Sequence, residues 1–193
     1  MTREDRGMAP HPSPRSPQFS VAELSALRLD GDVRLATRDT FVPIAMPLNE
    51  VVRAEATAAW IPPGYAAIFT TAAWIHGALP REPSTYHAQL VENSPKGRVW
   101  RAGVVIRTWP IPEADLVSIG GVLVSGVERT FYDLARAYLT EPPNVDISRA
   151  LAWFLTREHA RERILAWLAS GRRLRYTRMV AELVQDEVTR YTS

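Results

Sequence analysis

The sequence predicts an α/β protein of the α+β kind, with a small, mostly antiparallel sheet flanked by helices and a helical hairpin at the C-terminus. Three observations lead to this class. Short β-rich runs bounded by turn signals occupy the centre of the chain, near residues 66–69, 86–92, 103–109 and 116–124. Segments with apolar residues at helical spacing lie before and after these runs. The chain has 193 residues, of which 46% are hydrophobic, so a core of ordinary size is expected.

Composition narrows the class of protein. The net charge is +2 and the pI is about 9.2, and all basic residues except Lys96 are arginines. Abundant arginine reflects either a genomic coding bias or contact with phosphate, which a guanidinium binds through a bidentate fork. The absence of cysteine removes disulfides, thiol catalysis and cysteine-ligated zinc. We expect a cytoplasmic protein without a membrane segment, because no apolar run approaches the roughly 20 residues that span a bilayer.

Composition and turn signals divide the chain into four expected segments. A proline-rich stretch at the start is typical of a disordered tail. A short helix and a hairpin follow, then the central strands and helices, and a proline pair at Pro142 separates the last helices. The expected segments are the tail 1–18, a reduced winged-helix-like unit 19–47, a central α/β domain 48–141 and the C-terminal helices 142–193.

The stretch 115–138 organises the rest of the chain. Gly120 and Gly121 separate two β-branched runs, and this pattern predicts a hairpin with a two-residue turn, since such turns need positive φ. Ser125 precedes Glu128 by three residues, which is the spacing of a capping box at the start of a helix. We therefore expect a strand, a turn, a second strand and a helix in direct succession.

Three charged residues on this helix are expected to form a structural brace. Arg129 lies four residues before Asp133, and Arg136 lies three residues after it. Residues three and four apart are neighbours on a helix, so the Asp133 carboxylate can be held by both guanidinium groups. With Ser125, Glu128 and Thr130, these residues make up the structural motif that we predict.

The first ordered segment is a helix followed by an arginine-bearing hairpin. Ser20 and Glu23 have the spacing of a capping box, and Arg34 and Arg38 lie on the hairpin that follows. One interpretation is the end of a winged helix, whose wing would contact DNA phosphates through Arg34 and Arg38. The other is a structural hairpin joined to the main sheet.

A second group of arginines lies near the C-terminus. The group contains Arg172, Arg173, Arg175 and Arg178, with Tyr176 among them, at the start of the last predicted helix. A helix start favours anions, so these residues are candidates for nucleic-acid binding. The alternative is a solvated, charge-rich face without a ligand.

No motif indicates an enzyme. The sequence contains no phosphate-binding glycine loop, no GxSxG and no HExxH, and no two histidines have the spacing of a metal site. His76 is expected to be a packed or capping histidine. We predict no catalytic residue, no metal and no cofactor. A nuclease-related or other enzyme of phosphate chemistry, with a site that these motifs do not reveal, is the alternative.

Four segments together resemble the AbiEi-like antitoxins of type IV toxin–antitoxin systems, in their actinobacterial form. The most specific is VLVSGVERTFYDLAR, similar to the family pattern V-T-[ST]-P-x-R-T-x-x-D-L-A-R, although Gly126 and Val127 replace the usual Thr-Pro. FTTAAWIHGAL resembles the family's [ST]-A-A-x-x-H-G helix start. ELSALRLDGDVRLATRDTFVPI resembles the end of a reduced winged-helix region, and TREHARERILAWLASGRRLRYTRMVAELV the C-terminal helical pair. The resemblance covers about residues 19–188.

The resemblance implies an antitoxin that also acts as a transcriptional regulator. Family members join a DNA-binding winged helix to a domain that opposes a nucleotidyltransferase-like toxin without needing to bind it. The implied partners are operator DNA of the protein's own operon and such a toxin. The reduced N-terminal region leaves a further alternative, an interaction module on the same scaffold that does not bind DNA.

Overall fold

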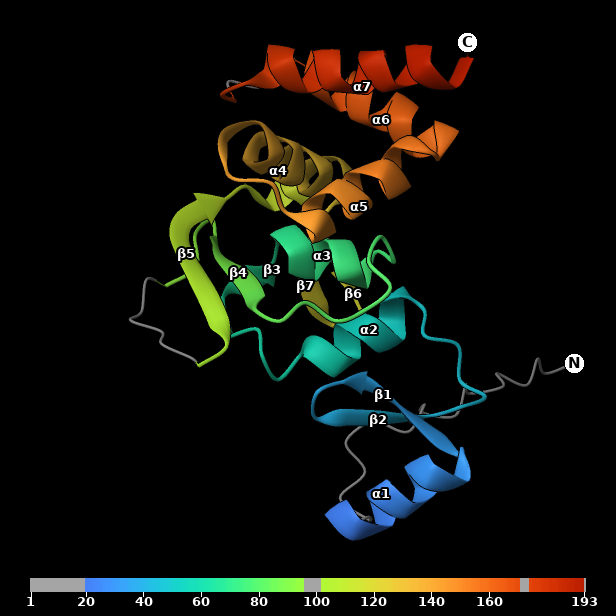
Figure 1. The fold of residues 1–193 in the computed structure, drawn as a ribbon. Coiled ribbons are helices and arrows are strands. Elements are labelled where there is room, and N and C mark those ends of the chain that lie inside the picture. Colours follow the sequence, from blue (N-terminus) through green and yellow to red (C-terminus); the bar gives the residue numbers. More distant parts are fainter. Residues whose placement is uncertain (1–19, 96–101, 171–173, 193) are drawn as a thin grey trace, which may run out of the picture. The chain divides into compact units, whose positions relative to one another are not determined.

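The fold is mixed α/β, as the sequence predicts, and a computed structural model describes residues 20–95, 102–170 and 174–192 (Figure 1). The chain divides into two compact units, Met1–Pro47 and Leu48–Ser193. The first contains one helix and one hairpin. The second contains a five-stranded sheet and the remaining helices.

The first unit begins with helix α1 (Val21–Asp30), and the predicted capping box at its start is present. The Ser20 hydroxyl accepts from the Glu23 amide at 3.3 Å, and the Glu23 carboxylate accepts from the Ser20 amide at 2.6 Å. Strands β1 (Val33–Thr37) and β2 (Thr40–Pro43) then pair antiparallel with each other. They form a separate two-stranded sheet, so the alternative of a hairpin joined to the main sheet is wrong.

The second unit is built on a sheet with the strand order β5-β4-β3-β7-β6. The strands are β3 (Tyr65–Ala67), β4 (Tyr86–Val91), β5 (Val104–Ile111), β6 (Leu116–Ile119) and β7 (Val122–Ser125). Pairs β3–β4 and β6–β7 are antiparallel, whereas β4–β5 and β3–β7 are parallel. The sheet is therefore evenly mixed, not mostly antiparallel.

The connection between β4 and β5 explains this difference. Residues 92–103 join the two strands and contain no two-residue hairpin signal. A parallel pair needs a return of roughly a dozen residues, and the connection between β4 and β5 is long enough for it. Hairpin signals between successive strands predict antiparallel pairs only, so they do not predict this parallel pair.

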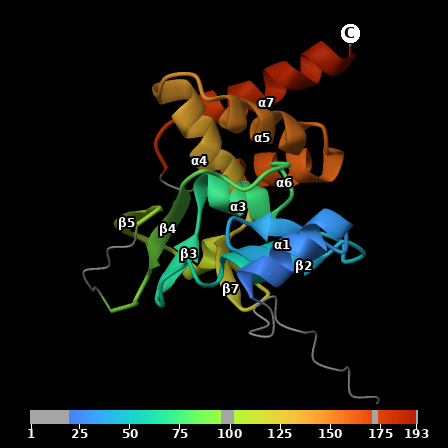
Figure 2. The ribbon, with the colours of Figure 1, turned by 60° about the horizontal axis from the view of Figure 1, so that its bottom comes forward.

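Helix α4 (Val127–Thr140) is the centre of the helical layer (Figure 1). It packs against α3 (Phe69–Ile75), α5 (Val145–Leu155), α6 (Glu158–Ala169) and α7 (Thr177–Thr192). Phe131 of α4 and Phe154 of α5 are both fully buried, and their rings meet edge to face with centroids 6.1 Å apart. Both views place α7 on the side of α4 away from the sheet, whereas α5 lies beside α4 and also contacts α3 (Figure 2).

The predicted hairpin turn is confirmed at Gly120 and Gly121, where φ is +53° and +76°. The turn lies beside α2 (Glu50–Thr57). A Cβ added at Gly120 would lie 3.0 Å from the Val51 carbonyl oxygen, whereas a Cβ added at Gly121 would meet nothing within 4 Å. Gly120 is thus required twice, for its backbone conformation and for the close approach of α2.

Replacing each glycine by alanine separates these two requirements. Both variants adopt a left-handed conformation that costs about 1–2 kcal/mol for a residue with a Cβ. We expect Gly120→Ala to lower the free energy of unfolding by more than Gly121→Ala, because only Gly120→Ala also displaces the α2 backbone. Chemical denaturation of the two variants measures the difference. Equal losses would show that the contact with α2 does not constrain the turn.

Candidate functional site

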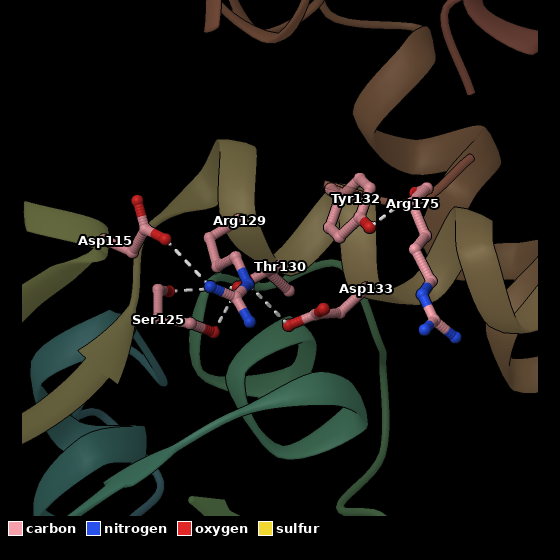
Figure 3. A network of polar contacts seen from close by, with 7 residues as sticks. All are labelled: Asp115, Ser125, Arg129, Thr130, Tyr132, Asp133 and Arg175. Atoms are coloured by element: carbon pink, nitrogen blue, oxygen red, sulfur yellow. Dashed lines mark hydrogen bonds and ion pairs between the residues drawn. The ribbon is translucent and has the colours of Figure 1, made fainter. Parts of the chain in front are cut away.

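Arg129 lies between two carboxylates where the hairpin meets α4 (Figure 3). Its Nη1 donates to Asp115 Oδ2 at 2.8 Å, and its Nε donates to Asp133 Oδ2 at 3.0 Å. The side chains of Arg129, Asp115 and Asp133 are only 12%, 1% and 8% exposed. Asp115 ends the 3₁₀ turn Glu113–Asp115 that leads into β6, so the interaction fastens the hairpin to the helix.

The brace exists, but its partners differ from those expected. The sequence predicts one carboxylate held by two arginines, whereas the structure has one arginine held by two carboxylates. No ion pair joins Arg136 to Asp133 in the part of the chain that the structure describes, although the Arg136 charge favours ionisation of Asp133. Helical spacing reveals neighbours on one helix, and Asp115 is brought in from outside α4 by the hairpin.

Burial and charge act in opposite directions within the brace. Burial raises the pKa of Asp133, and Arg129 opposes this rise without cancelling it. Burial alone would lower the pKa of Arg129, but the two carboxylates outweigh it and the pKa is raised. Arg129 is therefore fixed in its charged form. Removing one partner of a buried ion pair typically costs about 3–5 kcal/mol, because the other charge stays buried without compensation.

The expected capping box between Ser125 and Glu128 is wrong. Gly126 is the N-cap of α4, and no side chain caps it. Ser125 is fully buried as the last residue of β7, so its hydroxyl bonds inward, 2.7 Å from Thr130 Oγ1. Thr130 donates to the Ser125 carbonyl oxygen at 2.9 Å. Glu128 instead pairs with Arg163 of α6 at 2.6 Å.

His76 connects the second resemblance segment to the first. It is the C-cap residue of α3 and is 5% exposed. Its Nε2 lies 2.8 Å from the Ser125 carbonyl oxygen, which also accepts from Thr130, so Nε2 must carry the proton as the donor. Its Nδ1 lies 3.5 Å from Glu50 Oε1 of α2, and this interaction with His76 lowers the pKa of Glu50. These contacts hold α2, α3, β7 and α4 together.

Tyr132 extends the network to the C-terminal arginines. Its hydroxyl donates to the Arg175 carbonyl oxygen at 2.6 Å, while the Arg175 guanidinium extends away from the tyrosine (Figure 3). Burial raises the pKa of the Tyr132 hydroxyl, so it stays a neutral donor. The chain just before α7 is thus attached to α4 by its backbone, which leaves the Arg175 side chain exposed.

The predicted nucleic-acid-binding arginines have unequal surroundings. Arg34 is half-buried and donates to the Met46 carbonyl oxygen, so it supports the chain that follows the hairpin. Arg38 is exposed in the turn between β1 and β2. Arg175 and Arg178 are exposed, and Arg178 makes a surface ion pair with Glu182 at 2.9 Å. Arg172 and Arg173 lie outside the residues that the structure describes.

Within 20–95, 102–170 and 174–192, no three His, Cys, Asp or Glu side chains gather closely enough to hold a metal ion. Among the helices of this part, none combines the length and apolar character needed to cross a membrane.

The fold and the brace define a mixed α/β domain in which one motif joins a hairpin, a central helix and the C-terminal helices. The family model of the AbiEi antitoxin C-terminal domain matches residues 65–186, which is more than half of the chain. The protein therefore belongs to the AbiEi antitoxin family, and the resemblance inferred from the motifs is confirmed for residues 65–186. No curated protein matches the chain.

The brace leads to a prediction for Asp133. We expect Asp133→Ala to lower the free energy of unfolding by about 3–5 kcal/mol, because the change leaves Arg129 buried with one of its two partners missing. Asp146→Ala is the matched control, since Asp146 is half-exposed and pairs with Arg149 on the surface. It should cost about 1 kcal/mol or less. Thermal and chemical unfolding of both variants provide the measurement.

The same variants separate a structural role from a functional one. If Asp133→Ala unfolds like the wild type but abolishes the biological activity, Asp133 acts directly and the brace assignment is overturned.

Proposed function

We propose that the protein is the antitoxin of a type IV toxin–antitoxin system in the cytoplasm, acting against a nucleotidyltransferase-like toxin that it need not bind. The supporting observation is the family match over residues 65–186, which spans the sheet, the brace and most of the C-terminal helices. The brace residues are internal, so we assign them to the scaffold. The surface that acts on the toxin or its target then lies elsewhere on the same domain.

Growth rescue tests the antitoxin function. The full chain is co-expressed with each neighbouring gene, and a nucleotidyltransferase-like gene is expected to stop growth alone and to permit it with the antitoxin. Asp133→Ala serves as the control for the scaffold and should rescue less as its folded fraction falls. Failure of the folded wild-type chain to rescue growth from any neighbouring gene would reject the proposal.

We also propose that the protein regulates its own operon by binding DNA through exposed arginines. Arg175 and Arg178 support this, because both are exposed at the start of α7 beside Tyr176, whose ring is 44% exposed. Guanidinium groups beside an exposed aromatic ring are suited to nucleic acid. Arg172 and Arg173, adjacent in sequence, extend the group, and Arg38 adds a contact from the wing of a reduced winged-helix unit, residues 19–47. Arg34 we assign to support of that unit.

The DNA proposal predicts a salt-dependent affinity that depends on four arginines. Replacing Arg172, Arg173, Arg175 and Arg178 by alanine should weaken binding to an operator duplex. The plot of log K against log salt has a negative slope, and its magnitude should decrease by roughly 0.9 for each phosphate-contacting arginine that is removed. Binding titrations of the full chain at several salt concentrations measure both effects.

A second variant controls for lost charge. Arg149→Ala with Arg157→Ala removes exposed arginines near the two ends of α5 and should weaken binding less than Arg175→Ala with Arg178→Ala. Unchanged binding after loss of all four C-terminal arginines would overturn the assignment. Equal weakening in the two double variants would show a nonspecific effect of net charge.

A further inference from the structure

One face of the sheet is polar where β4 pairs with β5. In the parallel register, His87 lies beside Val105, and Gln89 lies beside Arg107. Paired residues and alternate residues of a strand share a face, so His87, Gln89 and Arg107 are on the same side. The opposite side carries Ala88, Leu90, Val104 and Ile106, which belong to an apolar cluster. The polar side chains therefore lie on the same face as Val91 and against Phe69, both of which belong to the main core.

Phe69 contacts two of these polar side chains. Its ring meets the His87 ring edge to face at 5.1 Å, and the Arg107 Cζ atom lies 5.5 Å from its centroid. Phe69 has a φ of +57°, an unusual backbone conformation for a bulky side chain. Such strain persists only where the surroundings hold it, and it is commonly found where a ligand binds. Phe69 thus contacts both an imidazole and a guanidinium.

Helix α4 adds positive charge beside the same region. Arg107 and Arg136 both lie close enough to Asp133 to favour its ionisation, whereas Arg129 is engaged by Asp115 and Asp133. Three guanidinium groups therefore share two carboxylates. The side chains of Arg107 and Arg136 are half-buried, and no hydrogen bond or ion pair to either is found within the described part of the chain. One positive charge remains without a partner.

We propose that Arg107, Arg136 and His87 bind the phosphate group of a nucleotide or of a nucleic-acid end. Two guanidinium groups can each donate two hydrogen bonds to phosphate oxygens. A phosphomonoester carries about two negative charges at neutral pH, which suits a pair of arginines better than a single carboxylate does. The site is separate from the arginines at the start of α7, so it does not depend on the proposed DNA contacts.

His87 supplies a neutral donor and a spectroscopic signal. Its pKa is lowered to about 4, mainly by burial and further by the Arg107 charge, so the imidazole is neutral at pH 7. Its Nδ1 is buried and has no hydrogen-bond partner within the described residues. A bound phosphate anion would favour the protonated imidazole and raise this pKa. The pKa of His87 is thus a direct report of an anion at this place.

The first experiment follows His87 by NMR in the full chain. Histidine resonances are titrated between pH 3 and pH 8 with and without inorganic phosphate, and His87→Gln assigns the signal. We expect the pKa of His87 to rise by at least one unit on addition of phosphate, while the resonances of the exposed His159 respond little to phosphate. An unchanged pKa of His87 at saturating phosphate would overturn the proposal, whatever the variants do.

The second experiment uses calorimetry to compare probes and variants. Inorganic phosphate, a nucleoside monophosphate and a 5′-phosphorylated oligonucleotide are each titrated into the wild type, Arg107→Gln, Arg136→Gln and the control Arg149→Gln. We expect at least tenfold weaker binding in Arg107→Gln and Arg136→Gln, and wild-type binding in Arg149→Gln. Arg107→Lys and Arg136→Lys keep the charge but lose the fork, so they test the site if a Gln variant unfolds.

The probes distinguish the source of the phosphate. Tightest binding of the nucleoside monophosphate supports a free nucleotide, and tightest binding of the oligonucleotide supports a nucleic-acid end. If neither organic probe binds more tightly than inorganic phosphate, the site holds an adventitious ion only and the proposal is overturned. Equal binding by the wild type and all four variants of Arg107 and Arg136 would also overturn it. Phosphate binding that survives the loss of Arg175 and Arg178 separates this site from the DNA proposal.

Discussion

Arg129, buried between Asp115 and Asp133, constrains how the second unit can fold. Removing these charges from water costs several kcal/mol per ion, and only close, well-directed contacts offset that cost. Asp115 must therefore lie beside the first turn of α4, although the hairpin separates them in sequence. The two-glycine turn makes this possible, because it fixes the pairing of Leu116 with Ser125 and so places Asp115 next to the start of the helix. The Gly126 amide then donates to the Asp115 carbonyl oxygen at 2.8 Å.

Two segments of the family resemblance meet at one atom. The carbonyl oxygen of Ser125 accepts hydrogen bonds from Thr130, in the same segment, and from His76, in the segment FTTAAWIHGAL. A buried carbonyl with two donors is fully satisfied, and the loss of either donor would leave it partly unpaired. The two segments therefore depend on each other physically. Their joint presence in the sequence identifies the scaffold. Contact with a partner is left to exposed residues outside this network.

Local chemistry was readable from the sequence, and long-range pairing was not. The Ser20 capping box and the Gly120–Gly121 turn each follow from neighbouring residues alone, and both are present. The Ser125 capping box had the right spacing but failed, because Ser125 remains part of β7 and its hydroxyl is drawn into the core. The pairing of Arg129 with Asp115 and the parallel return of β5 depend on the sheet, which no local pattern specifies.

Arginine is abundant in this chain, and individual arginines have different structural roles. Arg129 forms ion pairs with two carboxylates, and Arg53 donates to the carbonyl oxygens of Trp74 and Leu79. Such residues account for part of the high pI without offering anything to a ligand. Exposed arginines such as Arg175 cost little to leave unpaired, because water solvates them, so exposure alone does not identify a site. Arg107 and Arg136 differ from both groups, since half-burial removes part of their hydration while no carboxylate of their own replaces it. Two such guanidinium groups beside Asp133, whose pKa is raised, either lower the stability of the fold or hold an anion. The Phe69 ring and the His87 imidazole, which lie beside Arg107, favour the second explanation.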